Sequence, residues 1–247
     1  MSIRPVAFEP PTVSAHLLGS VDFAAALALQ RRLVYEAGEQ FEPRIVLLIC
    51  EHRPLIALGR AGSRAHVRLS DDELRRRELA LVWTNRGGGA WPHLPGQLAI
   101  YPLVPLALIG WSVGRFFGLL RQGLQNALAE FHVPTQTRPG SLGLWGRSGQ
   151  LVAGGAAVKD WITYHGAFLN VAPEMSLFRR VVTDPLGRTS AGSLAQERQG
   201  HVAMPTVRSA VVRHLSAAFG CEKFHLHTGH PFLAGHPNPP ESARRAS

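Results

Sequence analysis

The chain has 247 residues, of which 45% are apolar and 17% charged, a balance typical of a globular chain of one or two domains that excludes an intrinsically disordered one. Its formal net charge of +9 suits an acidic partner, either nucleic acid or an acidic carrier protein. The arginines occur in short clusters rather than in one basic arm, and no nucleic-acid-binding motif is present, so we expect no nucleic-acid partner.

Three features predict a cytoplasmic protein. No apolar run reaches the roughly 18 residues of a transmembrane helix, so we expect no membrane association. The N-terminal segment MSIRPVAFEP lacks the apolar core of a signal peptide. The two cysteines, Cys50 and Cys221, are too few for a disulfide framework, which fits a reducing compartment.

The first half of the chain predicts alternating helices and strands. Apolar residues on one broad face predict a helix over 21–37, and the run RIVLLIC predicts a buried strand over 44–50. The segment 70–73, Ser-Asp-Asp-Glu, is a capping box that opens a short helix, which we expect to extend to about Leu79. A strand is predicted to follow over 81–84.

The second half contains the clearest helix, over 112–131, where apolar residues recur every three or four positions and form one stripe that we interpret as core. Two long helices beside many strands favour a sheet with helices on one side. Residues 229–247, rich in Pro, Gly, Ser and Arg, are predicted to be a disordered tail after one domain of residues 1–228. The remaining predicted elements are strands at 98–103, 142–145, 150–159 and 161–171 and a helix at 205–219.

Two segments hold the residues best suited to chemistry. In the loop 85–97, NRGGGAWPHLPGQ, three consecutive glycines let a backbone approach a ligand closely, although a plain turn between strands uses the same residues. No G-x-G-x-x-G opens a helix there, which argues against a dinucleotide loop. In the segment 163–171, His165 beside Gly166 alone suggests a structural histidine. The two segments together indicate one site.

A series of short motifs extends this pair of segments along the chain. The motifs are Glu51-His52-Arg53-Pro54, Leu58-Gly59-Arg60, Arg86-Gly87-Gly88, His93, Pro95-Gly96-Gln97-Leu98, Tyr101-Pro102, His165-Gly166 and Leu169-Asn170-Val171. In this order they resemble those of the octanoyl-[acyl-carrier-protein]:protein octanoyltransferases of lipoate assembly, relatives of the lipoate and biotin ligases. Phe178, Ser193 and Leu194 are similar to the flanks of that family's nucleophile segment, and the resemblance extends over about residues 15–220.

The resemblance implies a fold and an activity. The fold is expected to be α/β (α+β), a mixed sheet flanked by helices with a smaller C-terminal sheet portion. The family's reaction is a ping-pong acyl transfer without a cofactor, in which a cysteine takes octanoate from a carrier-protein thioester and a lipoyl-domain lysine accepts it. The expected ligand and partners are therefore a medium-chain acyl group, acyl carrier protein and lipoyl domains. The implied ligand-binding residues are Arg86, Gly87, Gly88, His93, Gly96, Gln97, Gly155, His165, Gly166 and Asn170.

The two positions that carry the family's chemistry differ in this chain. By the resemblance, Asp184 stands in the place of the nucleophilic cysteine and Gln150 in that of the site lysine, so no family catalytic residue is intact. In the glycine-rich loop, Trp91-Pro92 replaces a Thr-aromatic pair and Leu94 replaces a glycine. Asp184 is suited to act as a general base for a directly attacking amine, and its other interpretation is a turn residue before a proline.

The remaining reactive side chains are interpreted as structural. Cys50 ends a predicted strand and Cys221 follows a predicted helix, and neither matches the nucleophile segment. Lys159 lies far past Gln150 along the same strand and is interpreted as a strand-end lysine. Four histidines near the tail lack an accompanying set of carboxylates or cysteines, so we expect no metal site. These histidines are His225, His227, His230 and His236.

Three functions remain open from the sequence. The first is an acyltransferase of lipoate metabolism that works by direct transfer or with divergent groups. The second is a non-catalytic protein, a pseudoenzyme, that binds an acyl group or a carrier domain. The third, an adenylating lipoate or biotin ligase, is disfavoured because Gln150 replaces the lysine expected to bind the adenylate phosphate. We expect an apolar pocket between the loop 85–97, the strand 150–158 and the strand 163–171, able to take a medium acyl chain.

Overall fold

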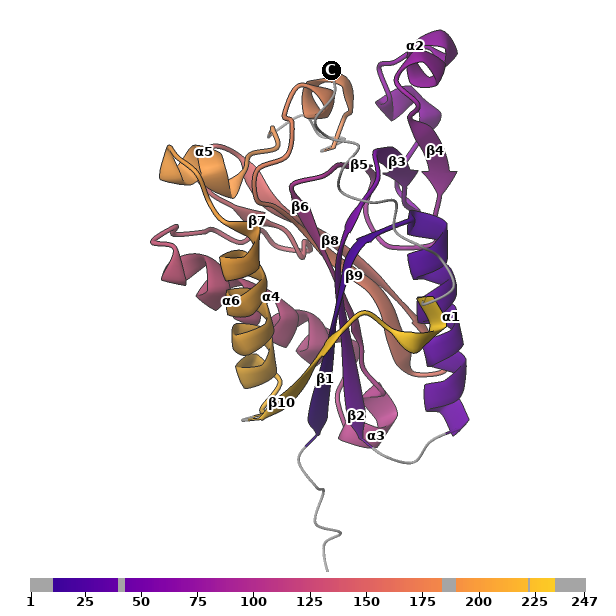
Figure 1. Ribbon diagram of the computed structural model, residues 1–247, viewed down its shortest axis with the longest axis vertical. Coiled ribbons are helices and arrows are strands. Elements are labelled where there is room, and N and C mark those ends of the chain that lie inside the picture. The colour runs from indigo at the N-terminus through magenta and orange to yellow at the C-terminus, as the bar shows by residue number, and fades with distance from the viewer. Residues whose placement is uncertain (1–10, 40–42, 184–189, 222, 234–247) are drawn as a thin grey trace, which may run out of the picture.

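A seven-stranded mixed sheet forms the centre of the computed structural model, which describes residues 11–39, 43–183, 190–221 and 223–233 (Figure 1). The strand order is β10-β1-β2-β6-β9-β8-β7. Strand β1 is parallel to both of its neighbours, and the other pairs are antiparallel. The strands are β1 (Thr12–Val21), β2 (Arg44–His52), β6 (Gln97–Leu103), β7 (Leu144–Trp145), β8 (Gln150–Lys159), β9 (Ile162–Asn170) and β10 (Phe224–Thr228).

The strands in the middle of this sheet are covered on both faces. In β2, Leu47 and Ile49 belong to one hydrophobic core, whereas Leu48 and Cys50 belong to another. Successive side chains of a strand point to opposite faces, so an uninterrupted apolar run suits a strand between two layers. The strand predicted over 44–50 is confirmed.

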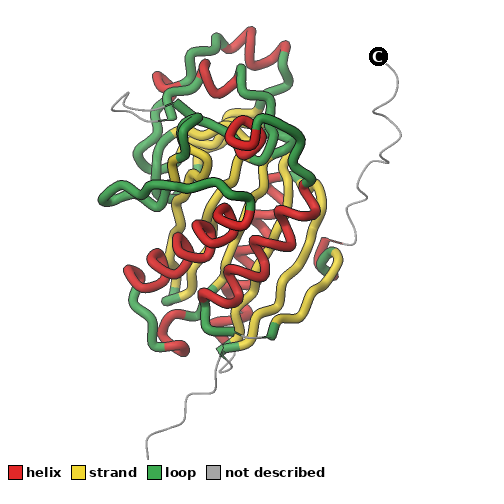
Figure 2. Tube along the Cα trace, turned by 90° about the vertical axis from the view of Figure 1, so that its left-hand side faces the viewer, coloured by secondary structure: helices red, strands yellow, loops and turns green. Residues whose placement is uncertain are grey.

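Helices lie on both faces of the sheet (Figure 1; Figure 2). Helices α4 (Val113–Glu130) and α6 (Met204–Ala218) pack against each other on one face. Helix α1 (Phe23–Glu39) lies on the opposite face, against β6 and β9. The expectation of helices on one side only is therefore wrong. An amphipathic pattern shows that one helix face is buried, but it does not show which side of a sheet receives that face.

Local sequence determines where the long helices begin and how closely they pack. Ser112 caps α4, since its Oγ accepts a hydrogen bond from the Arg115 N–H at 3.1 Å. Asp22 caps α1 through its Oδ1, which accepts from two first-turn N–H groups at 2.9 and 3.1 Å. Between α4 and α6, Gly123 leaves room for Leu215, whose Cδ2 would lie 2.7 Å from a Cβ at position 123.

A second, three-stranded sheet of order β4-β3-β5 lies at one end of the large sheet (Figure 1). Its strands are β3 (Leu55–Leu58), β4 (Ala80–Trp83) and β5 (Ala90–His93). The resemblance places a smaller sheet at the C-terminal end, and the structure corrects this by building it from residues 55–93. Helix α2 (Asp71–Arg76) begins at the predicted capping box: Ser70 Oγ accepts from the Glu73 N–H at 3.2 Å, and Glu73 Oε2 accepts from the Ser70 N–H at 2.8 Å.

The sequence does not predict several short or irregular elements. Strands β3, β5 and β10 have only four or five residues, and β1 has no regular alternation, because its side chains are buried on both faces. The predicted extension of α2 to Leu79 is wrong, since the helix ends at Arg76. The other unpredicted elements are α3 (Leu106–Ile109), α5 (Leu194–Arg198) and the 3-10 turns η1 (Arg64–His66), η2 (Leu177–Arg180) and η3 (Pro231–Leu233).

The last described residues pack along the domain. Strand β10 pairs in parallel with β1, and η3 then contacts α1, where the Arg32 guanidinium lies 3.2 Å from the centre of the Phe232 ring. Residues 229–233 of the predicted tail therefore follow the surface of the domain, while 234–247 lie outside the described residues. Within the part of the chain that the structure describes, no helix has the length and apolar character needed to cross a bilayer.

Candidate functional site

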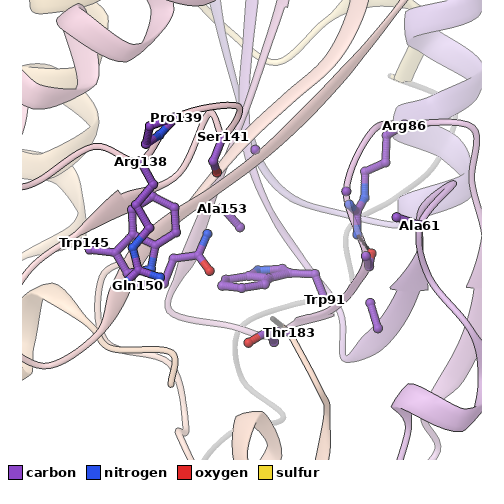
Figure 3. A pocket seen from close by; sticks show the side chains of 14 residues that line it. Ala61, Arg86, Trp91, Arg138, Pro139, Ser141, Trp145, Gln150, Ala153 and Thr183 are labelled. Carbon is purple, nitrogen blue, oxygen red and sulfur yellow. Dashed lines mark hydrogen bonds between the residues drawn. The ribbon is translucent and has the colours of Figure 1, made fainter. Parts of the chain in front are cut away.

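A cavity of about 250 Å³ opens between the glycine-rich loop after β4 and the start of β8 (Figure 3). In Figure 3, Arg86 lies on one side, and Arg138, Trp145 and Gln150 lie on the other. The Trp91 indole extends between them, towards the Gln150 amide. The lining residues are Ala61, Arg86, Gly88, Gly89, Ala90, Trp91, Arg138, Pro139, Ser141, Trp145, Gln150, Ala153, Gly154 and Thr183.

The expected position of the pocket is right for two of its three walls. The loop 85–97 and the strand 150–158 line the cavity, whereas no residue of 163–171 is among its lining residues. The segment 138–145 forms the third wall instead. The glycine-rich loop lies directly on β8, since the Gly87 N–H donates a hydrogen bond to the Ala156 carbonyl at 3.4 Å. The walls of the cavity contain cationic, amide and aromatic side chains, so the expectation of an apolar pocket is corrected.

Arg86 is held within its own loop by backbone carbonyls. Its Nη1 donates to the Gly87 oxygen at 2.9 Å, and its Nη2 donates to the oxygens of Ala57 and Gly89, each at 3.1 Å. Burial lowers the pKa of Arg86 to about 10, so the guanidinium stays charged at neutral pH. None of the described carboxylates pairs with Arg86. Its charge therefore favours a polar or anionic ligand group at this wall.

Two aromatic rings shape the cavity. Trp91 is buried and packs edge-on against Phe178, with ring centres 5.4 Å apart. Across the cavity, the Arg138 guanidinium lies 4.4 Å from the centre of the Trp145 ring. The Trp91 indole N–H and Arg86 Nε are both buried and have no acceptor among the described residues. A buried donor without an acceptor costs about 1–3 kcal/mol, so both residues would gain from a partner that a small local shift brings within reach.

Gln150, the residue at the family's lysine position, lies at the start of β8 and lines the cavity. Its side-chain Nε2 donates to the Val152 carbonyl at 3.1 Å. Its backbone bonds to the segment 190–192, which holds this end of β8 in place. Thr183 lines the same cavity and directly precedes Asp184 in the sequence. Asp184 itself lies outside the described residues.

A second cavity, of about 410 Å³, lies beyond the glycine-rich loop against α4. Gly88, Ser141 and Gly154 line both cavities. The loop touches β8 between them, because a Cβ on Gly155 would lie only 2.0 Å from the Gly87 oxygen. The approach therefore requires glycine at position 155. The remaining lining residues are Arg60, Gly87, Gly114, Phe117, Gly118, Arg121, Gly140, Leu142, Gly155 and Ala156.

Replacing Gly155 with alanine is expected to lower the free energy of unfolding by about 1–3 kcal/mol, the usual cost of overpacking, because the new methyl group forces the loop away from β8. Gly38→Ala in α1 is the matched control, since a Cβ there meets nothing within 4 Å. The control is expected to be neutral or stabilising by up to about 1 kcal/mol. Urea unfolding followed by tryptophan fluorescence measures both. Native stability in Gly155→Ala would contradict the close contact.

Three of the implied ligand-binding residues form a buried hydrogen-bond chain and line neither cavity. Gln97 Nε2 donates to Asn170 Oδ1 at 2.8 Å and to the Pro92 carbonyl at 3.2 Å, which leaves Gln97 Oε1 to accept from His93 Nδ1 at 3.0 Å. Asn170 Nδ2 in turn donates to the Gly192 carbonyl at 2.9 Å. This series of hydrogen bonds connects β5, β6 and β9 to the segment after residue 190. These residues therefore stabilise the strands around the site.

His165 fixes the start of the glycine-rich loop to β9. Its Nε2 donates to Asn85 Oδ1 at 3.1 Å, and its backbone N–H donates to Gln30 Oε1 of α1 at 2.7 Å. The residue has a φ of +56°, a left-handed conformation that histidine adopts more readily than most residues. Burial, together with the charges of Arg86 and Arg31, lowers the pKa of His165 to about 3, so the ring is neutral.

A buried Cys–His pair lies apart from both cavities. His52 Nδ1 donates to the Val21 carbonyl at 2.8 Å, and its Nε2 accepts from the Tyr101 hydroxyl at 2.6 Å, with Cys50 Sγ 3.6 Å away. Burial raises the pKa of the Cys50 thiol and lowers the pKa of His52 to about 4. The pair is therefore a neutral thiol beside a neutral imidazole, and it is unsuited to nucleophilic catalysis.

The other candidate reactive residues also lie away from the two cavities. Cys221 Sγ donates to the Pro11 carbonyl at 2.7 Å, and burial raises the pKa of its thiol to about 11. Lys159 is an exposed residue at the end of β8. The rings of His227 and His230 pack against His16, with centres 4.6 and 4.8 Å away. Over the described ranges, no group of three or more His, Cys, Asp or Glu residues is arranged to hold a metal ion.

The implied site residues thus divide into two groups. Arg86, Gly87, Gly88 and Gly155 line one or both cavities, and the others support the surrounding strands. Gly96 and Gly166 are needed for packing, since a Cβ would lie 2.6 Å from the Ala172 oxygen at position 96 and 2.2 Å from the Ile100 oxygen at 166. Sequence reasoning missed the wall 138–145, although its Pro-Gly turn and Trp145 are visible in the sequence.

The chain matches known proteins over most of its length. Residues 22–216 match the family model of the lipoyl protein ligase A/B catalytic domain. The octanoyltransferase of Geobacter metallireducens is 38% identical over 164 residues, covering 66% of this chain and 73% of that protein. The octanoyltransferase of Chloroflexus aurantiacus is 33% identical over 216 residues, covering 85% of this chain and 96% of that protein.

Solved structures agree on the fold. Lipoate-protein ligase A bound with ATP superposes with a TM-score of 0.70 at 14% identity, covering 90% of this chain and 91% of that one. The bipartite lipoate protein ligase of Thermoplasma acidophilum, studied with its E2 lipoyl domain, gives a TM-score of 0.69 at 14% identity and covers 91% and 90%. The mixed sheet flanked by helices is therefore confirmed.

Proposed function

The chain belongs to the lipoyl protein ligase A/B catalytic domain family and is lipoyl/octanoyl transferase-like, and from this we propose that it transfers a medium-chain acyl group from a carrier-protein thioester directly to a lipoyl-domain lysine. One observation supports the proposal: Gln150, at the family's lysine position, and Thr183, which directly precedes Asp184 in the sequence, line one cavity together with Arg86 and Trp91. Arg86 and Trp91 each also carry one buried N–H that has no acceptor among the described residues.

Direct transfer requires no covalent enzyme intermediate. The lysine amine attacks the thioester carbonyl carbon, the C–N bond forms, the C–S bond breaks, and the thiolate leaves as the carrier thiol. The proton that the amine releases passes to a base and then to the thiolate. We assign Asp184 as this base because it follows Thr183 in the sequence. The positive charge of Arg86, which lines the cavity, is assigned to stabilising the negative charge that develops on the carbonyl oxygen.

Acyl carrier protein and a lipoyl domain are the proposed partners, and the cytosol is the proposed compartment. The formal net charge of +9 supports docking to acidic domains. Attraction between exposed charges is screened over about 10 Å at 0.1 M salt, so the affinity for both partners is expected to fall as salt is added.

Gln150 favours a second candidate, a non-catalytic protein that binds the acyl group or its carrier. An uncharged amide hydrogen-bonded to the Val152 carbonyl cannot assist proton transfer as the family's lysine does. No cysteine or lysine is among the residues described as lining either cavity. A protein of this kind retains the fold and the pocket but catalyses no acyl transfer.

Incubation of the purified protein with octanoyl carrier protein and an apo lipoyl domain is expected to add one octanoyl group to the lipoyl domain, as measured by mass spectrometry. Gln150→Ala together with Asp184→Ala is expected to slow the transfer about 100-fold or more, because the proton acceptor is removed. His201→Gln, a change at an exposed residue that lines neither cavity, is the control and should keep the native rate. Binding of octanoyl carrier protein without transfer would establish the second candidate instead.

A further inference from the structure

Glu197, in helix α5, is the only buried carboxylate among the residues that the structure describes. Its side chain is 2% exposed, whereas aspartate and glutamate side chains are rarely buried without partners. Its Oε1 accepts a hydrogen bond from the Ser148 backbone N–H at 2.5 Å, and its Oε2 accepts one from Arg147 Nε at 3.5 Å. Arg147 Nη2 also donates to the Glu197 carbonyl at 3.2 Å. Helix α5 is thus bound to the turn 146–149, which precedes β8.

The Glu197 carboxylate is charged at neutral pH. Burial by itself raises the pKa of this carboxyl, but hydrogen bonds from Ser148 and Arg147, together with the charge of Arg147, outweigh burial and hold the pKa below its usual value. A charged acceptor makes both hydrogen bonds stronger than a neutral one does. The turn 146–149 is therefore fixed by more than its own backbone hydrogen bond, which joins its first N–H to its last carbonyl at 2.9 Å.

The turn 146–149 has glycines where the carboxylate and a neighbouring segment approach it. A Cβ on Gly146 would lie 2.6 Å from Glu197 Oε1, so glycine leaves room for the carboxylate. Gly149 has a φ of +129°, and a Cβ there would lie 2.4 Å from the Ser190 carbonyl oxygen. Glycine at these two positions lets the backbone of the turn approach both groups closely.

The same contacts hold one wall of the first cavity. The turn leads directly into Gln150, which lines that cavity at the start of β8. The Gln150 N–H donates to the Ser190 carbonyl at 2.9 Å, and the Gln150 carbonyl accepts from the Gly192 N–H at 3.0 Å. Asn170 Nδ2 donates to the Gly192 carbonyl at 2.9 Å. Glu197 follows in the same stretch of chain, so its carboxylate attaches this stretch to the start of β8 a second time.

We propose that Glu197 is a positioning residue of the acyl-transfer site, whose carboxylate acts through the turn 146–149 to keep Gln150 and residues 190–192 in place at the wall of the first cavity. This rests on the proposed function, because it takes the acyl group to be transferred in that cavity. Glu197 is not among the residues that line the cavity, so it acts on the rate through the residues that it holds. Displacement of a site by about 1 Å can slow a reaction about 100-fold.

Two variants test the proposal from the two sides of the contact. Glu197→Ala removes the carboxylate, whereas Gly146→Ala keeps it but forces it away, a shift that a flexible side chain can make without unfolding the chain. Both variants are expected to lower kcat for octanoyl transfer to a lipoyl domain at least about tenfold, with KM for octanoyl carrier protein unchanged. Glu197→Gln keeps an oxygen for the Ser148 N–H and should recover most of the lost rate.

Amide hydrogen exchange followed by NMR measures the same displacement without acyl transfer. In Glu197→Ala and Gly146→Ala, the N–H groups of Gln150 and Gly192 are expected to exchange at least about tenfold faster than in the native chain, because their hydrogen bonds open more often. The matched control is Glu130→Ala, which removes a carboxylate that pairs with an arginine and lines neither cavity. The control should leave kcat and both exchange rates unchanged.

The outcomes separate this proposal from the proposed function. Unchanged exchange at Gln150 and Gly192 in both variants would overturn it, in an active or an inactive protein. A rise that is equally large throughout β9 would reflect lower global stability and would overturn it too, as would faster exchange with a native kcat. In a protein that transfers no acyl group the proposed function fails, and faster exchange confined to these two amides still supports the hold of Glu197 on the cavity wall.

Discussion

The double substitution Asp184→Cys, Gln150→Lys is expected to raise the rate of octanoyl transfer to a lipoyl domain about 100-fold or more above that of the native chain. A thiolate is a far stronger nucleophile towards a thioester than a carboxylate, and a lysine beside it supplies the proton transfer that the Gln150 amide lacks. Gln150 lines the cavity at the start of β8, and Thr183 lines the same cavity, so a lysine at position 150 enters this space. The variant should also accumulate an octanoyl-cysteine adduct that mass spectrometry detects.

Two further variants separate the contributions of the thiol and the ammonium. Asp184→Cys alone keeps the nucleophile without the lysine, and Asp184→Ser with Gln150→Lys keeps the lysine without the thiol. Both should gain far less than the pair, because groups that act as a unit are strongly non-additive. A double variant no faster than the native chain would contradict the assignment of the two positions. Adding Trp91→Thr to it then shows whether the altered loop blocks the acyl group.

Acidification from pH 7.5 to pH 5 is expected to destabilise the protein by roughly 4 kcal/mol or more, with about 2 kcal/mol from each of the buried histidines His52 and His165 and a further contribution from His93. Burial lowers the pKa of His52 to about 4 and of His165 to about 3, and the pKa of His93 lies well below its usual value for the same reason. In the unfolded chain, histidine titrates near about 6.5. The unfolded state therefore takes up protons that the folded state cannot. The contribution to stability is complete above about pH 6.5 and is lost as the pH falls towards the folded values.

The carboxylates change the stability of the protein in a lower pH range. A hydrogen bond from the Ser70 backbone N–H, followed by one from Arg180, lowers the pKa of Glu73 to about 2, and hydrogen bonds from Arg213 and His214 lower that of Glu130 to about 2. Their contributions are present above about pH 4.3, the usual glutamate pKa, and are lost only below it. Destabilisation between pH 6.5 and 5 therefore reports on the histidines.

Urea unfolding at a series of pH values measures this slope. His165→Asn is expected to remove about 2 kcal/mol of this destabilisation, because asparagine does not titrate and tolerates the positive φ of position 165. His201→Gln, at an exposed position, should leave the slope unchanged. A stability that is constant between pH 7.5 and 5 would contradict the neutral, buried state of these rings.

Elements whose signals lie within one stretch of sequence were predictable. The stripe over 112–131 locates α4 to within about a residue, and the capping box at 70–73 marks the start of α2. The short strands of the small sheet are stabilised by partners distant in sequence, as Leu55 is by Ala80 and His93, so local pattern carries little information about them.

The candidate site shows the same division. The glycine-rich loop is identifiable because its residue types are distinctive, and Gln150 because the resemblance places it at the family's lysine position. His93 and His165 are equally distinctive, yet their side chains bond to Gln97 and Asn85 and line neither cavity, because the identity of a residue does not give the direction of its side chain. The strand of Trp145 and its turn into the next strand are predictable, and β7 does pair with β8, but the sequence does not show that the Trp145 ring faces the cavity opposite Arg86.

Strand β10 protects the outer edge of strand β1. All five residues of β10 are exposed, yet its backbone covers the outer edge of β1 from Val13 to Leu17. A chain cut before Phe224 would leave that edge as a row of unsatisfied donors and acceptors, a template on which a second molecule can add its own strand. Truncation there should promote aggregation even though it removes almost nothing from the hydrophobic interior.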